Sequence, residues 1–165
     1  MLAGNRRCVV YSCMGIVLEP PTAAAGVHIG VGRAEAARQC AVHGDPETFH
    51  RGDETVPSLM VRARSGPTIF VYFDDADRVN AVELGRPDNG ESVTFLGIDV
   101  FGTPADEVIE ALDPHAEVNV TDGGHSVTAP SLHIALWRPT VPESAEDPEG
   151  RYFESVLVAK PGYDG

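Results

Sequence analysis

The residues that could do acid–base or metal chemistry are scattered along this chain. The six histidines, at positions 28, 43, 50, 115, 125 and 133, include no pair at the HxH or HxxxH spacing that brings two imidazoles to one metal ion. No Gly-x-Ser-x-Gly, Walker or His-Glu-x-x-His motif occurs. Glu83 and Asp99 could form an acid pair on one sheet face, although such residues more often point to solvent. We therefore predict no catalytic residue, no metal ligand and no cofactor site.

An acidic tetrapeptide, Asp74-Asp75-Ala76-Asp77, superficially resembles a calcium loop. Calcium loops of the EF-hand type alternate their ligands and need a glycine at the sixth position and a distant glutamate. Arg78 and Val79 interrupt that spacing at once. We predict a polar turn here, without a metal.

Four residues next to a proline-rich and acidic loop over 140–150 are of types that anchor protein interfaces. They are Trp137, Arg138, Tyr152 and Phe153. Large aromatic side chains usually fill protein cores, and core packing is the favoured interpretation of these residues. These four are the candidate interaction residues.

The negative charge of the chain limits the classes of partner that it can bind. The chain has 165 residues and a formal net charge of -13, and its 42% apolar content is typical of a soluble globular protein. Residues 66–165 carry five basic and nineteen acidic side chains. Such a chain would be repelled by nucleic acid and by anionic membranes, so we predict neither as a partner. A simply solvated acidic face is the favoured interpretation of this charge, and a protein partner with a basic surface is the alternative. Eleven arginines against one lysine indicate a GC-rich, bacterial coding bias.

Residues 1–25 are predicted to be an N-terminal extension or leader. Arg6-Arg7, the apolar run 8–18 and three alanines at 23–25 imitate a signal peptide, but Glu19-Pro20-Pro21 is unusual before a cleavage site. Two of the three cysteines, Cys8 and Cys13, fall in this segment, so no disulfide framework is predicted. We expect a cytoplasmic protein, with an exported or lipid-anchored envelope protein as the alternative. No apolar run is long enough to span a membrane.

Residues 26–165 are predicted to form a single α+β domain, with a mostly antiparallel sheet and two short helices on one face. Apolar and aromatic residues dominate 68–73 and 78–84, which predicts a hairpin. Two helices are expected at 33–42, with Ala34, Ala37, Cys40 and Ala41 on its apolar face, and at 103–112, with Thr103 as N-cap. One strand interrupted at Gly97, and strands at 27–32, 57–63, 116–120, 131–137 and 151–159, complete the prediction.

The order helix, linker, strand, turn, strand occurs twice, which suggests half-repeats over 26–90 and 91–160. Gly30-Val31-Gly32-Arg33-Ala34-Glu35, followed by Gly44-Asp45-Pro46, resembles the repeat of the superfamily of outer-membrane-assembly lipoproteins and β-lactamase-inhibitor-like proteins. The match covers 17 residues, has Val31 where that motif usually has Met, and lacks the paired cysteines of some members. The resemblance implies a scaffold or inhibitor that acts by binding proteins, and it transfers no functional residue.

These observations predict a non-enzymatic protein-binding module of the immunity or inhibitor type with an acidic surface. The alternatives are an enzyme or small-ligand carrier with a pocket between sheet and helices, and an envelope scaffold.

Overall fold

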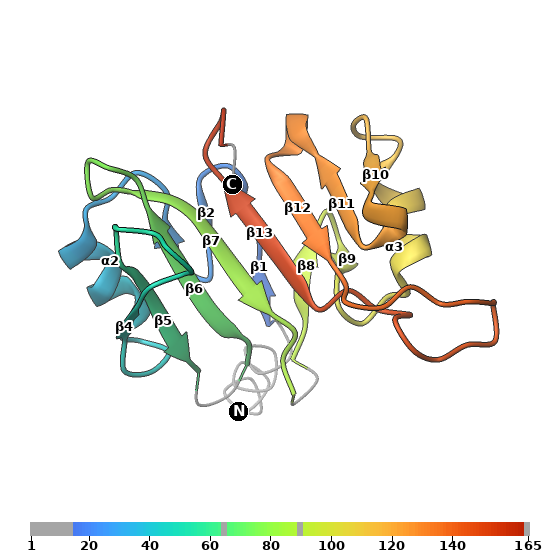
Figure 1. The fold of residues 1–165 in the computed structure, drawn as a ribbon, viewed down its shortest axis with the longest axis horizontal. Coiled ribbons are helices and arrows are strands. Elements are labelled where there is room, and N and C mark those ends of the chain that lie inside the picture. The colour runs from blue at the N-terminus through green and yellow to red at the C-terminus, as the bar shows by residue number, and fades with distance from the viewer. Residues whose placement is uncertain (1–14, 64–65, 89–90, 164–165) are drawn as a thin grey trace, which may run out of the picture.

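An eight-stranded antiparallel sheet forms the centre of the computed structural model, which describes residues 15–63, 66–88 and 91–163 (Figure 1). The strand order is β10-β11-β12-β13-β7-β6-β5-β4. The sheet therefore consists of two sets of four strands, β4–β7 and β10–β13, and the last strand of each set, β7 or β13, pairs with the other. The first set is β4 (Glu47–Phe49), β5 (Ser58–Arg62), β6 (Thr68–Phe73) and β7 (Val79–Gly85). The second set is β10 (Asn119–Thr121), β11 (Ser126–Ala129), β12 (Ile134–Trp137) and β13 (Ser155–Ala159).

The two helices among the described residues lie behind the sheet in the view of Figure 1, and neither of them covers its front face. The helices are α2 (Arg33–Cys40) and α3 (Ala105–Leu112). Short strands precede each helix: β1 (Ile16–Val17), β2 (Ala23–Ala24) and β3 (Val27–His28) before α2, and β8 (Val93–Phe95) and β9 (Ile98–Asp99) before α3. Two 3-10 turns, η1 (Asp122–Gly124) and η2 (Pro130–Leu132), flank β11. The predicted α+β class, with a mainly antiparallel sheet, is confirmed.

The core lies between the helices and the sheet, and strand alternation builds it. Ile69, Val71 and Val82 are fully buried, and their neighbours on the opposite strand face are not part of this cluster. Each fully buried aliphatic side chain contributes roughly 1.5–3 kcal/mol. The buried cluster is continuous from the first set of strands to the second, with Val156 and Val158 on β13 completing it.

Helix α3 begins two residues later than predicted, at Ala105, and Thr103 does not cap it. The chain before the helix is held by Asp99, whose Oδ1 accepts the backbone N–H of Phe101 at 3.2 Å and of Gly102 at 3.0 Å. The first helical N–H, of Ala105, donates to the carbonyl of Arg151 at 2.7 Å. A distant carbonyl therefore replaces the side-chain cap that the sequence suggested. The apolar stripe itself is confirmed, since Ala105, Val108 and Leu112 are buried.

The predicted apolar face of α2 is wrong in part. Ala34 and Ala41 are exposed, while Ala36 and Cys40 are fully buried. An alanine-rich helix has little contrast between its faces, so contacts with the sheet decide which residues are covered. Burial raises the pKa of the Cys40 thiol to about 11, which is consistent with its predicted role as a small buried hydrophobe.

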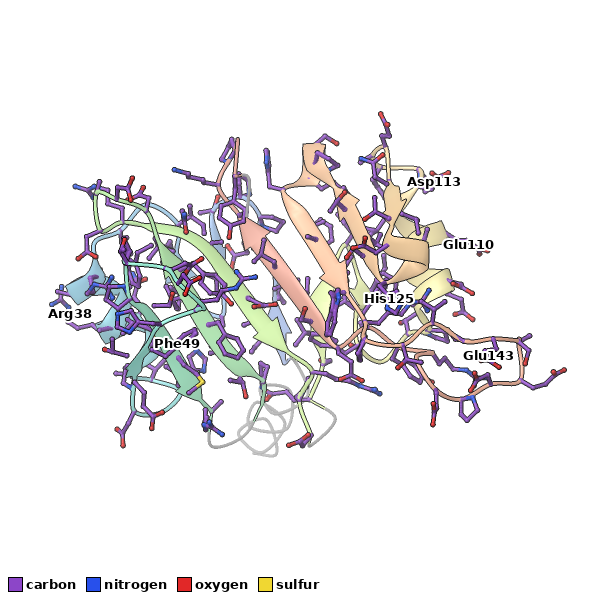
Figure 2. The ribbon with its side chains drawn as sticks, viewed as in Figure 1. Arg38, Phe49, Glu110, Asp113, His125 and Glu143 are labelled. Carbon is purple, nitrogen blue, oxygen red and sulfur yellow. The ribbon has the colours of Figure 1, made fainter. Side chains whose placement is uncertain are left out.

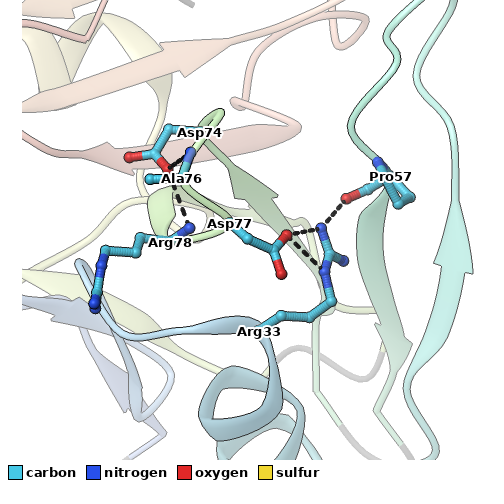
Figure 3. A network of polar contacts seen from close by, with 6 residues as sticks. All are labelled: Arg33, Pro57, Asp74, Ala76, Asp77 and Arg78. Atoms are coloured by element: carbon cyan, nitrogen blue, oxygen red, sulfur yellow. Dashed lines mark hydrogen bonds and ion pairs between the residues drawn. The ribbon is translucent and has the colours of Figure 1, made fainter.

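Arg33 ties the start of α2 to the sheet (Figure 3). Its Nε donates to Asp77 Oδ1 at 2.8 Å, its Nη2 donates to the Pro57 carbonyl at 2.7 Å, and its Cζ lies 4.0 Å from the centre of the Phe73 ring. In the same turn the Asp74 carboxylate accepts the N–H of Ala76. The acidic tetrapeptide is thus a tight turn held by its own side chains, as predicted.

Several strand predictions need correction. Residues 93–95 and 98–99 form the antiparallel hairpin β8–β9, not one interrupted strand, because Leu96 and Gly97 both adopt positive φ. The strand predicted over 131–137 begins at Ile134, after His133 in a left-handed conformation, and the one over 151–159 begins at Ser155. The strand predicted over 27–32 is only the two residues of β3, and β4 and β11 were not predicted.

Residues 16–25 belong to the folded domain, so the predicted boundary at 25 lies too late in the sequence. β1 pairs in parallel with β8, and Leu18, Ala24 and Ala25 are part of the buried core. Residues 1–14, with Cys8 and Cys13, lie outside the described residues.

Candidate functional site

The front face of the sheet, which neither α2 nor α3 covers, carries a second and smaller cluster of apolar side chains. Tyr72, Ala81 and Ala159 are its buried members. Phe49 packs edge-on against Phe70, with ring centres 5.8 Å apart and planes at 70°, and Figure 2 shows Phe49 in front of the first set of strands. We call this surface, formed by the outward residues of β5–β7 and β11–β13, the open face.

A hollow of about 650 Å³ lies in the open face, across the junction of the two strand sets. Glu83 on β7 and Leu157 on β13, which are direct partners in the ladder, both line it. Trp137 bounds the hollow on the β12 side, and Arg51 and Tyr163 also line it. Its wall is more apolar than polar, which is typical of surfaces that bind a partner through a few anchoring side chains.

The first half of the open face is covered by the chain's own side chains. The Cζ of Arg51, in the connection from β4 to β5, lies 5.1 Å from the centre of the Tyr72 ring. The Tyr72 hydroxyl donates to Glu83 Oε1 at 2.6 Å. Burial and this hydrogen bond both raise the pKa of Tyr72 well above its ordinary value, so its phenol keeps its proton and does not act as a base. Burial also raises the pKa of Tyr163.

The second half of the open face is uncovered at Trp137, whose exposed fraction is 45%. The β7–β13 ladder is centred on the Glu83–Leu157 pair. Ala81 and Ser155 each lie two residues before this central pair on their own strands. Tyr72 is the ladder partner of Ala81, and Trp137 is the ladder partner of Ser155. Tyr72 and Trp137 therefore occupy corresponding places in the two halves of the face, one covered and one exposed.

A long acidic loop starts and ends at the hollow, because it joins Trp137 to Ser155. Asp147 organises it by accepting the N–H groups of Glu143 and Glu149 at 3.1 and 3.0 Å, and these bonds lower the pKa of the Asp147 carboxyl. Gly150 closes the loop with φ +72°, where an added Cβ would lie 2.1 Å from the Thr140 carbonyl oxygen. Figure 2 shows Glu143 at the outer part of this loop, directed away from the sheet.

A second hollow, of about 610 Å³, lies at the end of the sheet near the β6–β7 turn. Four carboxylates line it, with Tyr72 and Tyr163 beside them. Lys160 Nζ is 3.6 Å from Asp74 Oδ2 and offsets part of this charge. The carboxylates belong to Asp53, Glu54, Asp74 and Asp75. Tyr163 lines both hollows, so it lies between the acidic end and the apolar centre of the face.

The four candidate interaction residues do not share one environment. Trp137 is exposed, and Tyr152 is half-buried under Arg86, whose Cζ lies 4.7 Å from its ring centre. Phe153 is fully buried and Arg138 is 4% exposed.

Arg138 acts within the fold. Its Nε donates to the Gly124 carbonyl and its Nη1 to the Gly150 carbonyl, each at 3.0 Å. It therefore joins η1 to the base of the acidic loop, and it lies 5.7 Å from the centre of the Phe153 ring. The pattern of residue types in the sequence does not indicate that Arg138 binds these carbonyls, because both carbonyls are distant in sequence.

The residues singled out for chemistry are not brought together. Glu83 lies on the open face, whereas Asp99 lies before α3 and binds backbone N–H groups. His43 contacts the Ala25 carbonyl and His125 contacts the Arg138 carbonyl. Within residues 15–63, 66–88 and 91–163, no group of three or more histidine, cysteine, aspartate or glutamate side chains is arranged to hold a metal ion.

The site residues that sequence reasoning missed are Arg51, Glu83 as a lining residue, and Tyr163. Arg51 and Tyr163 lie in irregular segments, where no periodicity indicates which face they cover. In the part of the chain that the structure describes, no helix has the length and apolar character needed to cross a membrane. Comparisons with protein-family models, with curated proteins and with solved structures find no match to this chain.

Proposed function

We propose that this chain is a protein-binding module of the immunity or inhibitor type, and that the open face around its central hollow is the binding surface. The partner is a protein with a basic surface. The observation that carries the proposal is Trp137: its indole is 45% exposed at the rim of an apolar hollow, on the sheet face that neither α2 nor α3 covers. Tryptophan is among the residue types most enriched at the energetic centres of interfaces.

The distribution of charge supports a basic partner. Acidic side chains lie on the loop over 143–149, whose two ends lie at the hollow, and at the acidic end near Asp74. Such an arrangement accelerates the encounter with a positively charged surface and disfavours nucleic acid. It also fits the formal net charge of -13.

The packing between the helices and the sheet favours protein binding at the open face over the binding of a small ligand inside the protein. Ala36 and Cys40 of α2 and Val61 and Val71 of the sheet are all fully buried in one cluster. Side chains therefore fill this part of the layer, and the hollow of about 750 Å³ between α2 and β4–β5, which Ala37 and Thr48 line, is a wide-open surface groove.

The test begins by capturing proteins on the immobilised chain and then compares two variants. Trp137→Ala removes the proposed anchor, and Val42→Ala removes an apolar side chain that is 78% exposed just beyond α2, on the covered side. A candidate partner must be retained by the unmodified chain, must be absent from the same resin without the chain, and must bind again after purification; its affinities for Trp137→Ala and Val42→Ala are then measured and compared.

The affinity of that purified partner is expected to fall with salt. Between about 50 and about 500 mM NaCl we expect the dissociation constant to rise at least ~10-fold, because the Debye length shrinks from about 13 Å to about 4 Å and screens the acidic groups. Isothermal titration calorimetry at each salt concentration measures the change. A dissociation constant that does not vary with salt would contradict the basic partner, and a partner that binds Trp137→Ala equally well would contradict the surface.

A further inference from the structure

The described part of this chain repeatedly places an arginine on an aromatic ring. In four such contacts an arginine Cζ lies 4.0–5.7 Å from a ring centre: Arg33 on Phe73, Arg51 on Tyr72, Arg86 on Tyr152 and Arg138 on Phe153. Trp137 has no such contact among these residues, although indole attracts cations more strongly than the other aromatic rings.

The correspondence between Tyr72 and Trp137 shows which kind of group would complete the exposed half. Tyr72 is covered by the guanidinium of Arg51 and is 7% exposed. Trp137, at the corresponding place of the second strand set, is 45% exposed beside the same hollow. A guanidinium on the indole would give the second half the arrangement that the first half already has.

The charges around the hollow favour a cation at this place. Glu83 lines the hollow together with Trp137, and its Oε1 accepts the Tyr72 hydroxyl; its Oε2 accepts no hydrogen bond from residues 15–63, 66–88 or 91–163 and can pair with a ligand. The acidic loop that follows Trp137 carries the exposed carboxylates of Glu143, Glu146 and Glu149, which do not line the hollow and act on a cation only through longer-range attraction. Arg51 is the basic side chain that lines the hollow, and it already lies on Tyr72.

We propose that the partner inserts an arginine side chain into the open-face hollow, with its guanidinium on the Trp137 indole and its charge paired with Glu83. This inference rests on the proposed function and names the partner's anchoring residue. Arginine fits better than lysine, because its planar and weakly hydrated guanidinium stacks on an aromatic ring while its edge pairs with a carboxylate.

The test uses Trp137, the single tryptophan of the chain, as its own fluorescent reporter. The probe is a peptide of three arginines separated by glycines, titrated into the full chain at low salt. Two matched peptides replace arginine by lysine or by citrulline, which is isosteric with arginine but neutral. We expect a saturable change in Trp137 fluorescence with the arginine peptide, about threefold weaker binding of the lysine peptide, and at least ~10-fold weaker binding of the citrulline peptide.

A pair of charge-matched variants separates the hollow from general attraction to an acidic protein. Glu83→Gln is expected to weaken binding of the arginine peptide about fivefold, since it removes the paired charge. Glu110→Gln changes the net charge equally on the outer side of α3, where Figure 2 shows this residue far from the open face, and should alter the affinity less than ~2-fold. Urea denaturation confirms that both variants fold. Should Glu83→Gln fail to fold, the comparison of arginine with citrulline on the unmodified chain decides.

Three results would overturn the inference. They are calorimetric saturation without a change in Trp137 fluorescence, equal affinity for arginine and citrulline peptides, and equal weakening by the two variants. Each of these refutes the arginine assignment alone if the purified partner still loses its affinity with Trp137→Ala. The proposed function fails separately, if that variant binds the partner normally.

Discussion

Replacing Trp137 by alanine is expected to weaken the complex with the partner at least ~100-fold, which corresponds to about 2.7 kcal/mol of binding free energy. The reason is that a large aromatic side chain at the rim of an apolar hollow loses its remaining exposed area on binding, whereas its neighbours on the face are small: Ala135, Ser155 and Ser126. Calorimetric titration of the purified partner into the variant measures the effect.

The same variant should leave the fold unchanged. Because Trp137 is 45% exposed in the free chain, we expect the free energy of unfolding to change by less than about 1 kcal/mol. Val42→Ala, on the covered side, serves as the matched control and should change neither the affinity nor the stability. A complex that forms with unchanged affinity would show that the open face is not the binding surface. A large loss of stability would show that Trp137 holds the fold.

Phe153→Ala is expected to lower the free energy of unfolding by about 4 kcal/mol. Phe153 is fully buried, and it lies where α3, the acidic loop and β13 meet. Its neighbour Arg151 accepts the first N–H of α3 through its carbonyl, and Arg138 lies 5.7 Å from the Phe153 ring. Truncation leaves a cavity beneath all of these contacts. Denaturation in guanidinium chloride, followed by circular dichroism, measures the loss.

Tyr152→Ala is the matched control, because the adjacent ring is half-buried and contacts Arg86. We expect it to cost no more than about 1.5 kcal/mol. Where Phe153→Ala is still folded, it should bind the partner with nearly unchanged affinity. If instead Phe153→Ala kept its stability and lost its binding, the ring would be an interface anchor and not a core residue.

The contrast between Trp137 and Phe153 shows what residue types alone can predict. Both are large aromatic residues next to one acidic loop, and residue type alone favoured a core role over an interface role for both. Their exposed fractions distinguish the two residues, since Phe153 is fully buried and Trp137 is 45% exposed. Phe153 precedes β13 in irregular chain, so strand alternation does not indicate its direction, whereas Trp137 is the outward residue at the end of β12.

The fold was predictable where the hydrophobic pattern was strong. The hairpin β6–β7 follows from two runs of β-branched and aromatic residues, and α3 follows from its apolar stripe. The strands β4 and β11 were missed because they are three and four residues long and contain polar side chains. Their conformation depends on pairing with neighbours that are distant in sequence, which no local pattern encodes.

The candidate site was predictable only in part, for a related reason. Trp137 was identified by residue type, and the acidic loop by composition. The hollow, however, is made by the pairing of Glu83 with Leu157, two residues 74 positions apart. Arg51 and Tyr163 reach it from irregular segments. A site that forms only where two strand sets pair cannot be recognised from the sequence pattern of either set alone.

Collisional quenching of Trp137 fluorescence by acrylamide tests the central claim most directly, because the signal comes from one side chain on the open face. The purified partner should carry no tryptophan, or should contain a tryptophan analogue with shifted emission. The Trp137 indole is 45% exposed in the free chain, and the bound partner should cover it. We therefore expect the bimolecular quenching constant to fall at least ~3-fold when the partner is bound at saturation. A quenching constant that is the same in the free chain and in the saturated complex would mean that the partner binds elsewhere.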